Sequence, residues 1–165
     1  MKKCMLAVMV FGFVLSACQT GAQYEKVSSS DCLVLVPSTL INQEGGPVLR
    51  KYYLELNDGQ VIKVPENKRS FIPIIISQED VYVISIVSKL DDYVVGEATK
   101  RPMNLQLPYV SGKAVVSDAT FVQEIIKKDA YSYVTRAGFI NTTSDQKAET
   151  MELFRKKKYS ESWQF

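Results

Sequence analysis

The chain has 165 residues, of which 46% are apolar and 23% are charged, a balance that fits one globular domain and excludes an intrinsically disordered protein. Lysine and arginine number 20 and aspartate and glutamate number 18, so no charge excess points to nucleic acid as a partner. The sequence has no histidine, the commonest metal ligand and the commonest general base near neutral pH, and we expect no metal, no cofactor and no catalytic residue.

The first 17 residues have the pattern of an export signal. Two lysines, Lys2 and Lys3, precede an apolar run from Met5 to Leu15. This run has about half of the ~20 residues that a membrane-spanning helix needs, so residues 1–17 are predicted to be a removable signal peptide. Once both lysines are removed, 18 basic and 18 acidic side chains remain, and the mature chain is neutral.

The signal segment ends in Leu15-Ser16-Ala17-Cys18, which matches the bacterial lipobox at every position. Here the chain resembles the bacterial lipoproteins. The resemblance implies that the thiol of Cys18 takes up a diacylglyceryl group, that the signal peptide is cut after the small Ala17, and that the new amino group is acylated. Several acyl chains together make a lasting anchor, whereas one chain binds only marginally. We therefore expect Cys18 to be the lipidation site and membrane lipid to be its partner.

The residue after the lipidated cysteine bears on the location of the protein. In lipoproteins, aspartate at this position is associated with retention on the inner membrane, and this chain has Gln19. The resemblance therefore implies a lipid-anchored protein of the outer membrane that faces the periplasm. The following segment is polar and includes Ser28-Ser29-Ser30, so residues 18–30 are expected to form the lipidated end and a flexible tether.

Residues 31–140 consist of short β-branched and aromatic segments separated by turn residues, which predicts an antiparallel β-sandwich of the immunoglobulin- or transthyretin-like kind. The segment that starts at Tyr82 is apolar on both faces, as expected of a central strand. Turns are predicted at 44–47, 57–59, 127–129 and 136–138. The predicted strands are 32–36, 50–56, 60–64, 71–76, 82–89, 93–98, 104–107, 113–117, 120–127 and 131–135.

Tyr82 follows the acidic pair Glu79-Asp80 at the start of its strand. In immunoglobulin-like sandwiches a tyrosine at such a place hydrogen-bonds back to the preceding corner; the alternative is an ordinary strand tyrosine on an edge. Segments 52–59, 76–84 and 112–116 resemble a group of uncharacterised bacterial lipoproteins with a transthyretin- or immunoglobulin-like sandwich. Those proteins usually have Pro-Gly where this chain has Glu79-Asp80, and the resemblance brings no catalytic residues.

The hydrophobic period changes from residue 141 onward, and residues 141–165 are predicted to be a C-terminal helix and tail. Thr143 and Gln146 have the spacing of a capping box at the start of this helix. One side of the helix is expected to pack on the sandwich through Ala148, Met151 and Phe154, with Leu153 off that stripe.

Three features were weighed for chemistry in the sandwich. The pairs Asp91-Asp92 and Glu79-Asp80 are adjacent in sequence, so their side chains diverge on a strand and a turn role is favoured over an acid–base pair or a calcium site. Cys32 opens an apolar strand and is predicted to be a buried structural thiol; the alternatives are intermolecular pairing and a nucleophile without a histidine partner.

The C-terminus carries Arg155-Lys156-Lys157-Lys158, followed by Tyr159, Trp163 and Phe165. A solvated helix end accounts for the basic run through the helix macrodipole. Two alternatives stay open: attraction of the basic run and the aromatic residues to anionic lipid headgroups, and the terminal aromatic pattern of outer-membrane barrels.

These patterns lead to a functional hypothesis: a non-enzymatic lipoprotein whose sandwich binds or scaffolds an envelope protein through a sheet edge or its turns. The alternative is an accessory lipoprotein of a secretion or envelope complex, because residues 42–48 resemble an early segment of type VI secretion subunits. A hydrolase is the least favoured class.

Overall fold

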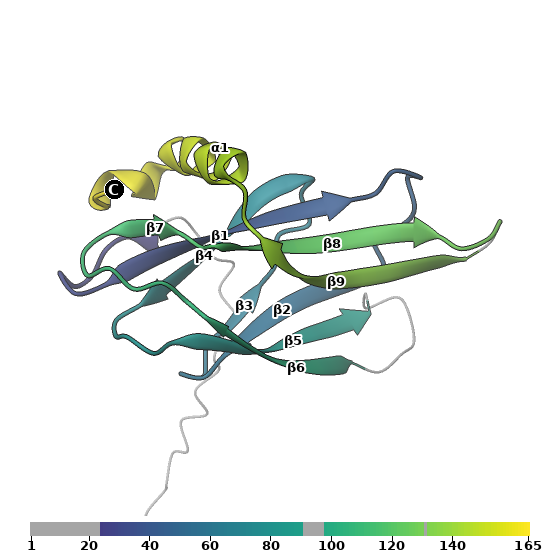
Figure 1. Ribbon diagram of the computed structural model, residues 1–165, viewed down its shortest axis with the longest axis horizontal. Coiled ribbons are helices and arrows are strands. Elements are labelled where there is room, and N and C mark those ends of the chain that lie inside the picture. Colours follow the sequence, from purple (N-terminus) through teal and green to yellow (C-terminus); the bar gives the residue numbers. More distant parts are fainter. Residues whose placement is uncertain (1–23, 91–97, 131) are drawn as a thin grey trace, which may run out of the picture.

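The computed structural model describes residues 24–90, 98–130 and 132–165 of the chain (Figure 1). Two β-sheets pack face to face and a helix follows the last strand, so the predicted β-sandwich with a C-terminal helix is confirmed. The elements are β1 (Cys32–Ile41), β2 (Arg50–Leu56), β3 (Val61–Lys63), β4 (Arg69–Ile76), β5 (Tyr82–Leu90), β6 (Thr99–Gln106), β7 (Ala114–Val116), β8 (Ala119–Lys127), β9 (Tyr133–Asn141), α1 (Ser144–Arg155) and the 3-10 helix η2 (Lys158–Ser162).

The upper sheet in Figure 1, called sheet A, has the order β4-β1-β8-β9, and the short strand β7 also pairs with β1. β1 pairs antiparallel with β4 along most of its length but parallel with both β7 and β8. We predicted an antiparallel sandwich, and sheet A differs from that prediction by its two parallel pairs. Pro37, which has no N–H to donate, lies between the stretch of β1 that pairs with β7 and the stretch that pairs with β8.

The lower sheet, called sheet B, is fully antiparallel and has the order β3-β2-β5-β6 (Figure 1). β5 lies between two strands, which confirms the prediction that the strand beginning at Tyr82 is central. The predicted hairpin at 57–59 joins β2 and β3, and its glycine, Gly59, takes a φ of +91°, a conformation that favours glycine.

The main core lies between the two sheets, where alternate residues of each strand point inward. Phe121 of β8 is fully buried at its centre, with the ring of Tyr52 at 5.9 Å and the ring of Phe139 at 5.3 Å. The aliphatic members include Val34, Val36, Leu54, Ile72, Ile74 and Val83.

A second core lies between the outer face of sheet A and the C-terminal segment. Phe154 of α1 is fully buried and meets Phe71 of β4 edge-on, with 6.1 Å between ring centres. The end of the sandwich where α1 and η2 cover the outer face of sheet A is called the covered end. Its buried members are Leu33, Leu35, Phe71, Ala114, Phe154, Tyr159 and Trp163.

The capping box of α1 is present as predicted: the Thr143 hydroxyl accepts from the Gln146 amide, and the Gln146 side chain accepts from the Thr143 amide. The packing stripe was partly wrong, because Ala148 is exposed and Thr150 is buried instead. Leu153, which was placed off the stripe, is half-buried and joins the second core. The stripe shifts because the helix packs on sheet A through Thr150 and Phe154, which are four residues apart.

Several strand and turn predictions differ from the structure. β1 extends to Ile41 and not only to residue 36, and β9 runs from Tyr133 to Asn141 where 131–135 was predicted. Most of the predicted strand 93–98 lies outside the described residues, and β6 begins at Thr99, five residues before the predicted 104. The predicted turn at 136–138 is wrong, because these residues lie inside β9 and continue its pairing with β8. A Cβ added at Gly138 would lie 3.2 Å from Nη2 of Arg101, so this glycine gives room to a side chain that crosses from sheet B.

Candidate functional site

The predicted lipidation residue, Cys18, lies outside the described residues, as do Cys4 and the signal segment. The described chain begins at Tyr24, six residues after Cys18. Within the described ranges, neither α1 nor η2 has the length and hydropathy of a membrane span. Lipidation of Cys18 therefore stays a prediction from the sequence.

The part of the expected tether that the structure describes lies against the domain. The Tyr24 ring contacts the Tyr159 ring at 5.2 Å between centres, and the Trp163 indole N–H donates to the Tyr24 carbonyl at 2.7 Å. The Lys26 ammonium donates to the Gly112 carbonyl at 2.9 Å. Residues 24–30 thus differ from the expected flexible tether, because their aromatic and hydrogen-bonding groups find partners at the covered end.

The basic and aromatic C-terminus divides into buried and exposed groups. Tyr159 and Trp163 are buried in the second core, so their role in the fold is structural. Arg155 lies in the last turn of α1, as expected of a cation near the negative end of the macrodipole, and its guanidinium lies 5.4 Å from the Phe165 ring centre. Lys157, Lys158 and Phe165 remain exposed, and the two lysines directly precede Tyr159, whose ring contacts Tyr24.

Cys32 is fully buried at the start of β1, as predicted for a structural thiol. Its sulfur accepts a hydrogen bond from the Val110 amide at 3.3 Å. Burial raises the pKa of the Cys32 thiol, and the hydrogen bond from Val110 opposes that rise. A thiol whose pKa is raised holds less of the reactive thiolate, so the structure favours neither a nucleophile nor a disulfide partner.

The acidic pair Glu79-Asp80 forms the corner before β5, and both side chains are exposed. Asp80 has a φ of +60°, and the Asn57 side chain holds this strained corner by donating to the Asp80 carbonyl at 2.9 Å and accepting from the Tyr82 amide at 3.0 Å. Asp91-Asp92 lies outside the described residues. No group of three cysteine or carboxylate side chains that could hold a metal occurs among the residues that the structure describes.

The Tyr82 side chain is half-buried, and its hydroxyl makes no hydrogen bond among the described residues. The corner tyrosine weighed from the sequence is therefore not formed, and Asn57 closes the corner instead. Asn57 follows β2 and the corner precedes β5, so these hydrogen bonds hold two strands of sheet B together. We assign them a role in the fold.

The end of the sandwich opposite the C-terminus in Figure 1 is called the open end. A cleft lies there between residues of the two sheets. Its volume is about 830 Å³, within the range of small-molecule sites. One wall is the inner face of β2, β5 and β6, and the other is β9. The sequence did not reveal this cleft, because its walls come from segments far apart in the chain.

Polar side chains take inward positions on the wall formed by sheet B. Arg50 follows the same face of β2 as Tyr52, and Ser88 follows the same face of β5 as Ile86. The Arg50 guanidinium donates to the Ser88 hydroxyl at 3.1 Å, and the Ser88 and Thr99 hydroxyls lie 2.6 Å apart. This chain of hydrogen bonds joins three strands across the inner face.

Arg101 of β6 also lines the cleft and reaches across toward Gly138 of β9, and Arg136 of β9 is a third cation of the lining. Burial raises the pKa of the Tyr52 hydroxyl, while the charges of Arg50 and Arg101 oppose that rise, so both guanidinium groups act on this hydroxyl. The cleft can therefore offer the guanidinium groups of Arg50, Arg101 and Arg136, together with several hydroxyls, to a polar ligand group.

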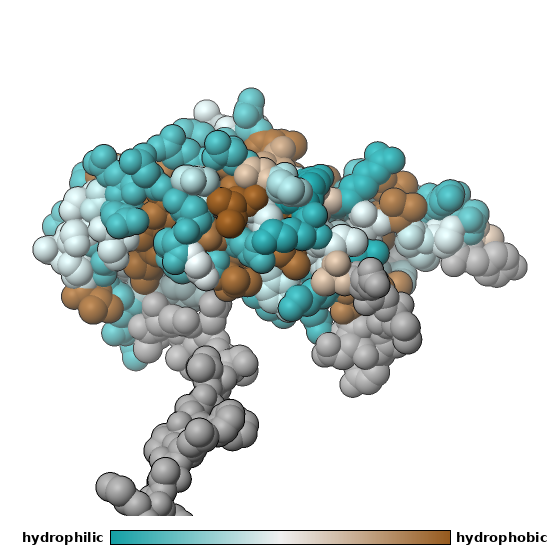
Figure 2. All heavy atoms as spheres, turned by 90° about the horizontal axis from the view of Figure 1, so that it is seen from below, coloured by the Kyte–Doolittle hydropathy of each residue, from teal (hydrophilic) through white to brown (hydrophobic). Residues whose placement is uncertain are grey.

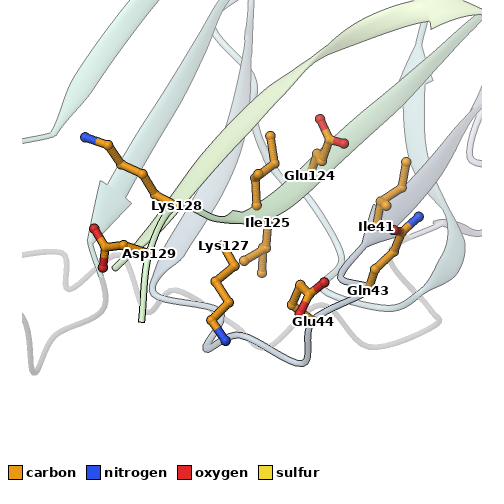
Figure 3. Close-up of a pocket in the computed structure, with 9 residues that line it drawn as sticks. Ile41, Gln43, Glu44, Glu124, Ile125, Lys127, Lys128 and Asp129 are labelled. Atoms are coloured by element: carbon orange, nitrogen blue, oxygen red, sulfur yellow. The ribbon is translucent and has the colours of Figure 1, made fainter. Parts of the chain in front are cut away.

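A smaller pocket of about 360 Å³ lies between the loop after β1 and the end of β8 (Figure 3). Glu44, Glu124 and Asp129 line it together with Lys127 and Lys128, so the two signs of charge are mixed. In Figure 3 the Lys128 and Asp129 side chains lie on the far side of β8 from Gln43 and Glu44. Such a mixed, open surface offers no single ligand chemistry.

The exposed surface of the sandwich is mainly hydrophilic where Figure 2 shows it, and the hydrophobic residues form separate patches there. The outer face of sheet B carries polar contacts, such as the Ser85 hydroxyl that donates to Glu55 at 2.5 Å and the ion pair of Glu55 with Lys100. Hydrogen bonds from Lys100 and then Ser85 lower the pKa of the Glu55 carboxyl. This face is therefore a solvated surface, which leaves the cleft as the candidate site.

Comparisons with known proteins give no match to any family model, any curated protein or any solved structure. The β-sandwich class stands on the two sheets themselves. The resemblance of segments 52–59, 76–84 and 112–116 to sandwich lipoproteins stays a prediction from the sequence.

Proposed function

We propose that this chain is a lipoprotein held on the outer membrane by acyl chains on Cys18, and that its sandwich binds or scaffolds another envelope component without catalysing a reaction. The observation that carries the proposal is the complete lipobox Leu15-Ser16-Ala17-Cys18, which follows an apolar run too short to span a bilayer. The acyl chains supply the membrane affinity, since each buried methylene contributes about 0.8 kcal/mol.

The docked position of Tyr24 supports a close attachment to the bilayer. Only residues 19–23 separate Cys18 from Tyr24. Six extended residues span roughly 20 Å at most. Because Tyr24 contacts Tyr159 and Trp163, the covered end of the sandwich is the part nearest the lipid surface.

The charges at the covered end fit this orientation. Lys157 and Lys158 are exposed, and Arg155 lies over the exposed Phe165 ring. Basic side chains near an anionic leaflet contribute about 1 kcal/mol each, and an aromatic ring among them suits the interface. The reading of the basic run as a lipid contact therefore gains support from its place next to Tyr24. The open end then faces away from the bilayer, toward other envelope components.

Substitution of the lipidated residue tests the proposal. We expect Cys18→Ser to abolish labelling by an alkyne fatty acid and to leave the protein uncleaved or released from the membrane pellet. Cys4→Ser is the matched control, since it removes a thiol from the same signal segment and should be labelled and fractionated like the wild type. Density-gradient separation of the two membranes then tests the outer-membrane assignment. Labelling and fractionation of Cys18→Ser like the wild type would contradict the proposal.

The nature of the partner distinguishes the scaffold from the secretion-complex alternative. The segment 42–48 lies at the open end, where the Asn42 side chain holds Gly46 by two hydrogen bonds of 2.8 Å and Gly46 lies against the Tyr133 ring. Crosslinking of the intact lipidated protein in cells, followed by purification, identifies what this end contacts. Recovery of secretion-system subunits would favour the alternative, and recovery of other envelope proteins would favour the scaffold.

A further inference from the structure

Three arginines line the cleft at the open end: Arg50 and Arg101 on the wall formed by sheet B, and Arg136 on β9. Arg50 and Arg101 form no salt bridge among the described residues, whereas Glu55, Asp118, Glu149 and Glu152 are each paired with a basic side chain elsewhere on the molecule. Arg50 donates one hydrogen bond, to Ser88, and Arg101 makes none within the described ranges. A guanidinium has five N–H donors, so most of the donors of this pair are unused.

Their position makes these unused donors significant. Both arginines lie on the inner face of sheet B, in phase with Tyr52 and Ile86, where a β-sandwich normally places apolar side chains. Arg50 is half-buried and Arg101 is exposed, so their unused donors stay accessible to a ligand that enters the cleft. Two guanidinium groups facing one space select an oxyanion, because a carboxylate or phosphate accepts from the fork of each.

A buried donor next to the cleft supports the same chemistry. Gln123 of β8 is 3% exposed, and its Nε2 has no hydrogen-bond partner among the described residues. Gln123 pairs in register with Ala137, which lines the cleft. This amide donor, which has no acceptor among the described residues, adds to the unused donors of the arginines.

The cleft also has apolar lining residues. Leu49 and Val134 are each 40% exposed, and on β5 Leu90 pairs in register with Arg50 and Ile86 with Arg101. A small inorganic anion would leave this surface in water. A ligand with an alkyl chain would cover it, at about 25 cal/mol for each Å² removed from water.

We propose that the open-end cleft binds a small amphipathic anion, with its carboxylate or phosphate head between Arg50 and Arg101 and its alkyl chain along Leu49 and Val134. The inference does not rest on lipidation of Cys18. An exported protein without acyl chains would keep the same cleft, so the two proposals succeed or fail separately.

Binding is tested on the full chain in lipid nanodiscs by following the backbone amide signals of the isotope-labelled protein. The probes are octanoate, hexyl phosphate, inorganic phosphate and the uncharged octyl glucoside, and empty nanodiscs titrated in parallel correct for partitioning. We expect saturable shifts at Thr99 and Thr135 with octanoate or hexyl phosphate, and affinity at least tenfold weaker with inorganic phosphate and octyl glucoside. The stronger of the first two probes tells whether the head is a carboxylate or a phosphate.

Variants assign the binding to the arginines. Arg50→Gln and Arg101→Gln should each weaken binding at least tenfold, as expected for loss of a charge-assisted pair. Lys63→Gln removes one positive charge on β3, away from the cleft, and should bind like the wild type. Ala137→Leu keeps both arginines and fills the cleft, so it should also weaken binding and serves if an arginine variant fails to fold. Equal binding of octyl glucoside, unchanged binding in the arginine variants, or no saturable shift at the cleft would overturn the proposal.

Discussion

The two ends of this sandwich fill the space beside a sheet in opposite ways. At the covered end, Phe71, Phe154 and Trp163 fill the space between the outer face of sheet A and the C-terminal segment. At the open end, the space between the two sheets is lined by arginines, among them Arg50 and Arg101, and remains a cleft of about 830 Å³. The covered end buries apolar surface, which stabilises the fold. The open end buries less apolar surface and leaves hydrogen-bond donors accessible in the cleft.

The contrast teaches that stability and binding are located in different parts of the same fold. A site needs polar groups that the fold alone would not select, and the rest of the molecule must provide the stability. If this division is correct, substitutions at the covered end should change the free energy of unfolding strongly. Substitutions at the cleft should change it little.

The largest effect is expected for Phe154→Ala. Phe154 is fully buried and contacts three aromatic rings, so truncation leaves a cavity and should lower the free energy of unfolding by about 3–5 kcal/mol. Urea denaturation measures this change. Val61→Ala, at an exposed position of β3, should change it by less than about 0.5 kcal/mol. A loss below about 1 kcal/mol for Phe154→Ala would mean that the covered end does not hold the fold together.

An intermediate effect is expected for Tyr159 at high pH. Burial raises the pKa of Tyr159 to about 12, and the neighbouring Tyr24 adds to the rise. An unfolded tyrosine ionises near pH 10, so the stability that neutral Tyr159 contributes is complete below pH 10 and is lost as the pH rises toward 12.

Tyr159→Phe should remove this dependence. Between pH 9 and pH 11.5 the wild type should lose roughly 2 kcal/mol more stability than the variant, as measured by urea denaturation at each pH. Tyr53→Phe, on the outer face of sheet B, is the control and should follow the wild type. Identical pH dependence of Tyr159→Phe and the wild type would contradict the tight burial of this ring.

The smallest effect is expected at the open end. Arg101→Leu replaces an exposed cation, which has no salt-bridge partner among the described residues, with an apolar side chain on the inner face. The free energy of unfolding should stay within about 0.5 kcal/mol of the wild type or rise slightly. Thermal unfolding followed by circular dichroism measures the change. A loss above about 1.5 kcal/mol would show that Arg101 supports the fold and would remove the contrast between the two ends.

The fold could be predicted from the sequence wherever hydrophobic residues repeat with a clear period. Alternation in β2 and β5 and the turn at 57–59 identified most of sheet B, and the spacing of Thr143 and Gln146 located the start of α1. The start of β6 was missed because Thr-Lys-Arg-Pro has little β propensity, and pairing with β5 decides its conformation. The prediction of a turn at 136–138 was wrong because Gly138 makes room for the Arg101 side chain and does not reverse the direction of the chain.

The candidate site could not be predicted for a different reason. Its residues are strand residues, and a polar residue in a strand usually faces water. The signal was present in the phase of alternation, since Arg50 is in step with Tyr52 and Ser88 is in step with Ile86. Recognising it requires knowledge of which face of each strand is inward and of which strands meet across the cleft, and both depend on the tertiary structure.

The placement of Cys32 has a practical consequence for experiments on this protein. Cys32 is the free cysteine of the described chain, with its sulfur shielded from solvent inside β1 and its ionisation suppressed. A thiol-reactive dye should therefore modify it only when β1 separates from its neighbours. The rate of dye modification of Cys32 then reports how often the domain opens transiently, and no label has to be engineered into the chain.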